Sequence, residues 1–353
     1  MATDKKNQHY IPKFYLRNFS YLNNKKQIGV FNIVKEFYYL KANLKHQGSK
    51  NFFYGVDGVI EDNLSLIEGD LAKIIRIILE TNEVPKKESE EHIDLLFFVA
   101  LTDLRNPVRI EGTKMMFQEM ASRIRELDEG ADTNRFVPSM THEEVIAMSF
   151  AGLKDLVTTI LDLDYKLLFN KTQKPFISSD FPIVRYNQYL EAKKWPQSKT
   201  GYGLTGLQIF IPLNSDVAII FFDSDIYKVG DKKKKTYSII KEEDIDSLNI
   251  LQFINCFETI FFNEKADEIY IRYLLNKSKR FKRANVSKAG LSFLFRDGDN
   301  EEDMIKSGKK NLIIMNSSDC ETNLKIDGVK IHSRGVAHKL HSSAAQLRKK
   351  VQR

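Results

Sequence analysis

The sequence of 353 residues has few cysteines and no long hydrophobic run. Its two cysteines, Cys256 and Cys320, show no CxxC spacing and cannot build a disulfide framework, which excludes a disulfide-stapled secreted scaffold. No stretch approaches the roughly 18 uncharged apolar residues of a membrane helix, and the first residues lack the apolar segment of a signal peptide. We therefore expect a soluble cytoplasmic protein without membrane contact.

Motifs of high specificity are also missing, because no metal-binding or phosphate-loop pattern stands out. Hydrophobic residues make up 42% and charged residues 29% of the chain, which is ordinary for a soluble globular protein. The chain is longer than one hydrophobic core usually supports, so we expect one large domain with an appendage, or two domains. Composition alone names no reaction.

The net charge of +7 is unevenly distributed. Residues 276–353 hold 18 Lys and Arg against 8 Asp and Glu, an excess of +10, so residues 1–275 carry −3. Basic clusters in this last quarter include KSKRFKR at 277–283, with Lys279, Arg280, Lys282 and Arg283. Such clusters can neutralise the phosphates of a nucleic acid. The alternative is a solvated tail that its charge keeps soluble.

The first half of the chain has the patterns of helices. Apolar residues at spacings of three and four predict an amphipathic helix over 60–78, and the nearly continuous apolar run at 93–104 predicts a buried helix. Asn106 followed by Pro107 is typical of an N-cap and first helical position. Thr141 and Glu144 have capping-box spacing, which predicts another helix.

After about residue 163 the pattern changes to short strands bounded by Asn, Gly, Pro and Lys. The sequence IPLNSDV predicts a hairpin turn between two of them. We therefore expect an α+β fold, in which a mostly helical N-terminal region packs on a mainly antiparallel sheet formed by residues after about 163. The C-terminal segment would be a basic extension.

The opening stretch NQHYIPKFYLRNFS, residues 7–20, is rich in functional side chains for a terminus. The rings of Phe14, Tyr15 and Phe19 can pin the segment to the core and so orient His9 and Arg17. Two interpretations stay open for His9, a catalytic group or a hydrogen-bonded structural residue.

A second polar stretch is PFISSDFPIV. Phe181 precedes Pro182 and favours extended geometry, so Asp180 would end a strand or lie in a turn, directly after Ser179. A loop carboxylate next to a rigid strand is typical of active sites. It is equally typical of turns in which the side chain accepts hydrogen bonds from backbone amides.

Glu61 and Glu68 stand seven residues apart on the predicted first long helix, and therefore share one helix face. At the rise of an α-helix their backbones are roughly 10.5 Å apart, which makes it difficult for the two alone to share one metal ion. Arg105 ends a strongly apolar helix, and a guanidinium there requires a carboxylate or phosphate partner. Either glutamate could pair with Arg105 or His9.

Three motifs together resemble a large bacterial family catalogued as a domain of unknown function. His9, Pro12, Tyr15, Leu16 and Phe19 match its opening pattern, written H-[YH]-[VI]-P-x-[FY]-Y-L-x-x-F. A second pattern, [ST]-S-D-x-P, is met by SSDFP at 178–182, and a third, P-L-[ST], is met by PLN at 212–214 with Asn at its last position. The resemblance implies a core domain over 7–275, helical over 59–160 and sheet-rich over 163–275, with residues 276–353 outside it.

Members of this family are linked to defence against phages, so the resemblance implies an antiviral effector. We expect a hydrolase acting on nucleic acid or a nucleotide, or alternatively a non-enzymatic sensor that binds a nucleotide or a phage component. The catalytic candidates are His9, Asp180, Arg105 and Arg17, with His9 as general acid or base and the arginines stabilising phosphate charge. The cofactor is undetermined, with a divalent metal such as Mg²⁺ open. The other candidate sets are substrate-binding residues Tyr15, Ser179, Lys279, Arg280, Lys282 and Arg283, and metal ligands Asp180, Glu61 and Glu68.

Overall fold

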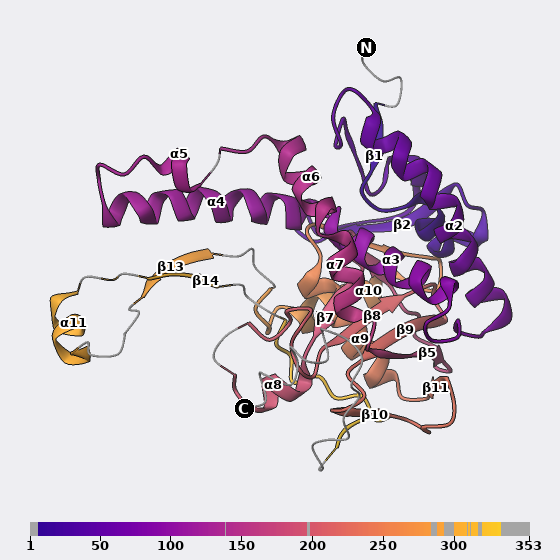
Figure 1. The fold of residues 1–353 in the computed structure, drawn as a ribbon. Coiled ribbons are helices and arrows are strands. Elements are labelled where there is room, and N and C mark those ends of the chain that lie inside the picture. The colour runs from indigo at the N-terminus through magenta and orange to yellow at the C-terminus, as the bar shows by residue number, and fades with distance from the viewer. Residues whose placement is uncertain are drawn as a thin grey trace.

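A computed structural model describes residues 6–137, 139–195, 198–283, 288–292, 300–308, 310, 312–316 and 320–332 (Figure 1). The N-terminal segment folds into short strands and turns. Its strands and α-helix are β1 (Asn7–His9), α1 (Lys13–Leu16), β2 (Gln27–Asn32), β3 (Phe37–Asn43) and β4 (Ser49–Asn51). Three 3₁₀ turns connect them, η1 (Arg17–Phe19), η2 (Tyr21–Asn23) and η3 (Leu44–His46).

Helices dominate the next part of the chain, as the sequence predicts. They are α2 (Val59–Thr81), α3 (Glu90–Leu104), α4 (Pro107–Leu127), α5 (Thr133–Phe136), α6 (His142–Ala151) and α7 (Leu153–Ile160). The predicted caps are confirmed, because the Asn106 side chain accepts from the backbone N–H of Val108 and Thr141 forms a capping box with Glu144. In Figure 1, α4 extends to the left, away from the two larger sheets.

The second half contains most of the strands. Its elements are β5 (Asp164–Asn170), β6 (Ser178–Ser179), β7 (Val184–Tyr186), α8 (Gln188–Ala192), β8 (Gln208–Pro212), β9 (Val217–Phe222), β10 (Tyr227–Val229), β11 (Thr236–Ile239), α9 (Glu242–Asn255), β12 (Thr259–Phe262) and α10 (Glu268–Ser278). The C-terminal part adds β13 (Lys288–Ser292), α11 (Glu301–Ser307), β14 (Leu312–Asn316) and β15 (Val329–Ile331). The β13–β14 hairpin runs beside α4 (Figure 1).

Two larger sheets organise the molecule. One has the strand order β11-β5-β9-β8-β7 and is antiparallel except for the β11–β5 pair, and its β8–β9 hairpin confirms the predicted turn. The other has the order β3-β2-β12-β6 and is fully antiparallel. The expectation of a mixed fold with mainly antiparallel sheets is confirmed.

The second sheet differs from the prediction, because two of its four strands come from residues 27–43 rather than from residues after 163. β2 pairs with β12 more than 200 positions away in the chain, from Asn32 opposite Thr259 to Gly29 opposite Phe262. Gly29 permits this pairing, because a Cβ at that position would lie 2.4 Å from the Phe262 ring.

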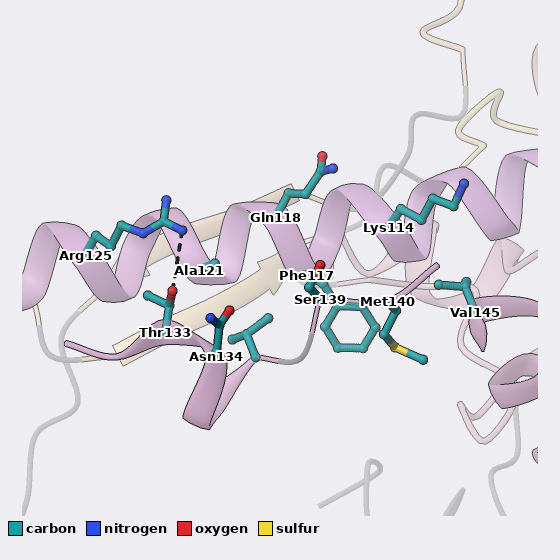
Figure 2. A pocket seen from close by; sticks show the side chains of 11 residues that line it. Lys114, Phe117, Gln118, Ala121, Arg125, Thr133, Asn134, Ser139, Met140 and Val145 are labelled. Carbon is teal, nitrogen blue, oxygen red and sulfur yellow. Dashed lines mark hydrogen bonds between the residues drawn. The ribbon is translucent and has the colours of Figure 1, made fainter. Parts of the chain in front are cut away.

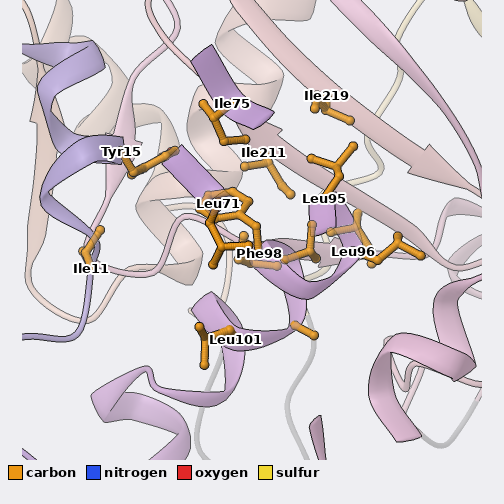
Figure 3. Packing of buried hydrophobic residues seen from close by; sticks show 14 of the residues in the cluster. Ile11, Tyr15, Leu71, Ile75, Leu95, Leu96, Phe98, Leu101, Ile211 and Ile219 are labelled. Carbon is orange, nitrogen blue, oxygen red and sulfur yellow. The ribbon is translucent and has the colours of Figure 1, made fainter. Parts of the chain in front are cut away.

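The N-terminal segment belongs to the main hydrophobic core. Figure 3 shows Ile11 and Tyr15 next to residues of α2, α3, β8 and β9, such as Leu71, Phe98, and Ile211. Smaller clusters fill the opposite face of the five-stranded sheet and the space between α9, α10 and the four-stranded sheet. Burial of this terminal segment at the centre fixes the backbone around His9.

Candidate functional site

Buried rings hold the N-terminal segment, as its sequence predicts. Tyr15 and Phe19 are fully buried, and the Tyr15 hydroxyl donates to the Pro212 carbonyl (2.7 Å) and lies 2.8 Å from the Ser178 hydroxyl. Tyr15 is also a predicted substrate-binding residue. Its buried hydroxyl therefore anchors the N-terminal segment to β6 and β8 and does not lie at the surface.

His9 lies on β1 and only 6% of it is exposed. Its Nε2 lies 3.1 Å from the Lys45 carbonyl oxygen, and because a carbonyl only accepts, Nε2 carries the proton. Burial of the ring, followed by the positive charge of Lys13, lowers the pKa of His9 to about 4. The imidazole is therefore neutral at pH 7, with its lone pair on Nδ1.

Arg105 is completely buried where α3 ends, and its Nη1 donates to Oε1 of Glu68 on α2 at 2.8 Å. This pair confirms the prediction that the guanidinium requires a carboxylate partner. Burial opposes the charge of Arg105, whereas Tyr54 and Glu68 favour it, and its pKa stays above the usual value. The Tyr54 hydroxyl donates to the backbone carbonyl of His9 at 3.1 Å, which ties this group to β1.

A cleft of about 490 Å³, here called the His9 cleft, brings several predicted residues together. Its walls include His9 from β1 and both Glu61 and Glu68 from α2, with Arg105 behind Glu68. The remaining lining residues are Lys6, Asn7, Lys13, Lys45, Leu64 and Ser65. Four predicted site residues thus belong to one neighbourhood.

A second hollow of about 570 Å³, the basic groove, adjoins this cleft through Lys13 and Lys45, which line both. Its charged lining is entirely positive, with no carboxylate among the lining residues. The six basic side chains are Lys13, Arg17, Lys25, Lys26, Lys41 and Lys45. Within the part of the chain that the structure describes, none of the six forms an ion pair with a carboxylate.

Local backbone geometry presents these lysines. The loop before β2 holds Leu22, Asn23 and Lys25 at positive φ, a conformation that costs an L-residue roughly 1–2 kcal/mol. The Asn24 carboxamide oxygen stabilises the turn by accepting from the backbone N–H of Lys26 (2.9 Å) and Gln27 (2.8 Å). Lys45 is held by its carbonyl, which accepts from both His9 and Asn7.

Arg17, a predicted catalytic residue, is exposed on η1 and belongs to the basic groove rather than to the His9 cleft. It also lines a wider hollow of about 830 Å³, which shares Arg17 and Lys25 with the groove. That hollow has charges of both signs, including Arg76, Glu80 and Asp216. Of these three adjoining hollows, the basic groove is the one whose charged lining residues are all positive.

The structure does not bring Asp180 into the His9 cleft. Its buried carboxylate accepts from the backbone N–H groups of Phe257 (2.6 Å), Glu258 (2.7 Å) and Thr259 (2.8 Å). Burial raises the pKa of Asp180 to about 6, whereas these amides and Arg283 lower it. Asp180 therefore binds backbone amides, as the second interpretation of this residue expects. The amides are not those of its own turn, because they belong to residues 257–259 at the start of β12.

Ser179 and Arg283 take part in the same internal network. The Ser179 hydroxyl is fully buried and donates to the Gln252 side chain at 2.6 Å. The Arg283 guanidinium donates to the carbonyls of Cys256 and Phe257, the latter at 2.8 Å. Both predicted substrate-binding residues thus support the turn that Asp180 holds.

The other basic residues after α10 lie at the surface. Lys279 forms an ion pair with Glu36 at 2.9 Å, and the Arg280 guanidinium lies 4.7 Å from the Phe281 ring centroid. Lys282 is exposed. Most of the remaining basic extension, including 333–353, lies outside the described residues.

The described residues contain neither a cluster of metal-binding side chains nor a membrane-spanning helix. No group of three or more His, Cys, Asp or Glu there could hold a metal ion, so Asp180, Glu61 and Glu68 do not form the predicted set of ligands. No helix in those ranges is both long enough and apolar enough to span a bilayer.

A separate pocket of about 300 Å³ lies between α4 and the α5–α6 segment (Figure 2). Lys114, Gln118 and Arg125 project from α4, and Arg125 lies 3.4 Å from the Thr133 hydroxyl. The lining contains none of the predicted residues, and it has two cations, Lys114 and Arg125, against six in the basic groove. The His9 cleft and the basic groove are therefore the better candidate site.

Sequence reasoning singled out His9, Glu61, Glu68 and Arg105 but expected Asp180 beside His9 and Arg105, and it missed the basic groove. Its cations come from one α-helix, two 3₁₀ turns, a loop and β3, so they follow no single helical or strand period. The only available signal was the density of lysine over 13–45. The net charge of −3 for residues 1–275 as a whole conceals this local excess.

Comparison with known proteins places the chain in a family without assigning it an activity. No curated protein and no solved structure matches it significantly. A family model does match over residues 7–266, which span both the N-terminal segment and β12. The chain therefore belongs to the family described as "Protein of unknown function (DUF4238)".

Proposed function

We propose that this chain binds the phosphates of a nucleic acid or nucleotide in the basic groove. The observation that carries this proposal is the set of six basic side chains around one hollow whose lining has no carboxylate, and none of the six forms an ion pair with another described residue. Cations fixed at that density repel one another, and a bound polyanion relieves the repulsion while releasing its own counterions. A groove with this charge attracts phosphate-bearing ligands electrostatically, whatever their base sequence.

Hydrolysis is a second candidate, and the position of His9 favours it. The imidazole stands at the junction with the groove, neutral at pH 7 and oriented by the Lys45 carbonyl. Nδ1 can accept a proton from a water or hydroxyl. The Glu68–Arg105 ion pair lies beside it and can stabilise charge that develops in the reaction. A base with a pKa of about 4 is weak, however, so binding ranks above turnover.

In biological terms we propose an antiviral effector of the cytoplasm, with a nucleotide or phage-component sensor as the alternative. The family resemblance supports the defence role, and the two buried free cysteines suit a reducing compartment. Residues 7–275 would form the acting domain. The basic extension after residue 275 would add non-specific affinity for nucleic acid.

The direct test replaces two groove lysines, as Lys25→Glu with Lys26→Glu, and measures oligonucleotide binding by fluorescence anisotropy. Removing two phosphate contacts and adding two negative charges lowers affinity by at least about 10-fold at moderate salt. The matched control, Lys232→Glu with Lys233→Glu, makes the same charge change on exposed lysines outside the groove. Equal losses in both variants, or no loss in the groove variant, would contradict the proposal.

Salt dependence gives the same experiment a second readout. Six single-strand phosphate contacts correspond to a slope of about −4 for the logarithm of affinity against the logarithm of salt concentration. The groove variant is expected to flatten that slope by at least about 1.4, and the control variant leaves it unchanged.

Turnover separates the two candidate functions. Incubation with DNA, RNA and nucleoside triphosphates, with and without Mg²⁺ or Mn²⁺, should yield products only if the site hydrolyses its ligand. His9→Ala would then abolish product formation while binding in the groove persists. Binding without products in any of these reactions would leave the sensor alternative.

A further inference from the structure

Two aromatic side chains next to the basic groove are exposed on β3. Phe37 is 58% and Tyr39 50% exposed, and their rings stack with centroids 6.3 Å apart and planes 22° apart. Rings this open contribute little to the core, since most of their apolar area stays in water. We call this pair the aromatic platform.

The platform and the groove lie along the same strand. Phe37, Tyr39, Lys41 and Asn43 are exposed along β3, but the register shifts between the Val30–Tyr39 and Ile28–Ala42 pairs, so that Tyr39 and Asn43 face opposite sides of this edge strand. Lys41 and Asn43 line the basic groove. Two residues of a strand span roughly 7 Å, so a ligand that crosses the edge of β3 can contact both the rings and the groove's cations.

The charges around the platform are compatible with a polyanion. Glu36, which directly precedes Phe37, pairs with Lys279 at 2.9 Å and lies 4.0 Å from Arg272. Lys41 Nζ lies over the ring of Tyr21, 4.9 Å from its centroid, which adds a third ring on the side of the groove. Aromatic faces beside a basic track are how proteins hold single strands, because every base has a face to stack.

An exposed aromatic pair on β3 also carries a cost. β3 is an edge strand of its sheet, and open apolar edges favour aggregation. A bound ligand that covers the rings removes this liability. Duplexes cannot do so without unpairing, since their bases are already stacked inside the helix.

We propose that Phe37 and Tyr39 stack the bases of a single-stranded nucleic acid whose phosphates lie in the basic groove. This inference rests on the proposed function and narrows its ligand to a strand with unpaired bases. Stacking supplies affinity that tolerates sequence, while the lysines supply the salt-dependent part.

The test compares three fluorescein-labelled probes of about 12 nucleotides, a single strand, a duplex and an abasic strand that keeps the phosphates. Binding is followed by anisotropy for the full chain, for Phe37→Ala with Tyr39→Ala, and for Leu66→Ala as an apolar control on α2 that is 77% exposed. The full chain should bind the single strand at least about 10-fold more tightly than the abasic strand. The double variant should lose that preference and keep its abasic affinity, and the control should match the full chain.

The possible failures are distinguishable. Equal affinity of the full chain for natural and abasic strands overturns the stacking inference and leaves phosphate binding in place. No binding of any probe overturns both. A double variant that changes self-association, with unaltered preference for the natural strand, overturns stacking in favour of a protein contact at the platform.

A fluorescence reporter decides the matter if the double variant folds poorly. The chain has one tryptophan, Trp195, so Phe37→Trp combined with Trp195→Phe places the only indole on the platform. Stacked bases should quench its emission on addition of the single strand but not of the abasic strand. Emission that both strands leave unchanged overturns the inference.

Discussion

The Asp180→Asn substitution tests whether this residue holds the fold together. The carboxylate accepts three short hydrogen bonds from the consecutive amides of Phe257, Glu258 and Thr259. Asparagine keeps the shape but replaces one oxygen with an amino group, which then faces a backbone donor. At least one charge-assisted bond is lost and the others weaken, so the free energy of unfolding should fall by about 2–4 kcal/mol.

Urea denaturation of the full chain at pH 7 measures this change. Asp216→Asn is the control, because its carboxylate, with the side chain 54% exposed, bridges to the surface Lys265 at 2.7 Å and accepts from the neighbouring Ser215 hydroxyl at 3.0 Å. That variant should stay within about 1 kcal/mol of the parent. The reasoning is refuted if Asp180→Asn unfolds at the same urea concentration as the parent. Native-state binding in the basic groove should be unchanged in both variants.

Two further predictions concern the His9 cleft. Glu68→Gln leaves the buried guanidinium of Arg105 with a neutral partner and should cost about 1–3 kcal/mol in urea denaturation, less than for a sealed pair because Glu68 is 28% exposed; an unaffected midpoint would show that the pair is not needed. The pKa of His9 is lowered to about 4 in the folded chain from 6.5 when unfolded, so the unfolded state takes up a proton first as the pH falls. The parent should therefore lose up to about 3 kcal/mol between pH 6.5 and 4 that His9→Gln does not lose, and parallel pH profiles of the two would contradict this sign.

Local elements were predictable where the determining interactions are close in sequence. The Asn106 cap with Pro107, the Thr141 capping box and the hairpin at 212–217 each depend on residues within a few positions of one another. The rings of the opening segment also indicated burial correctly, since a terminus rarely carries so many apolar side chains unless it is packed.

The four-stranded sheet was not predictable in the same way. β2 and β3 lie in a lysine-rich stretch, and β3 has only one buried residue, Ala42, so it lacks a strong apolar face. β2 becomes a strand through its pairing with β12, which follows it by more than 200 residues. Local propensity does not encode a partner at that distance, and tertiary context decides the outcome.

The candidate site divides along similar lines. Glu68 and Arg105 were a pair that burial and charge alone could suggest, because a buried guanidinium requires a carboxylate. Asp180 was ambiguous, since a carboxylate after a strand suits both catalysis and backbone hydrogen bonding, and only the position of residues 257–259 separates the two. The basic groove required the folded positions of five elements.

Photo-cross-linking of a single strand carrying 4-thiouracil, followed by mass spectrometry of the peptides, tests the central claim most directly. The account predicts cross-links within residues 13–45, at the basic groove and the aromatic platform beside it. Cross-links confined to other segments, such as the basic cluster at 277–283, would contradict it.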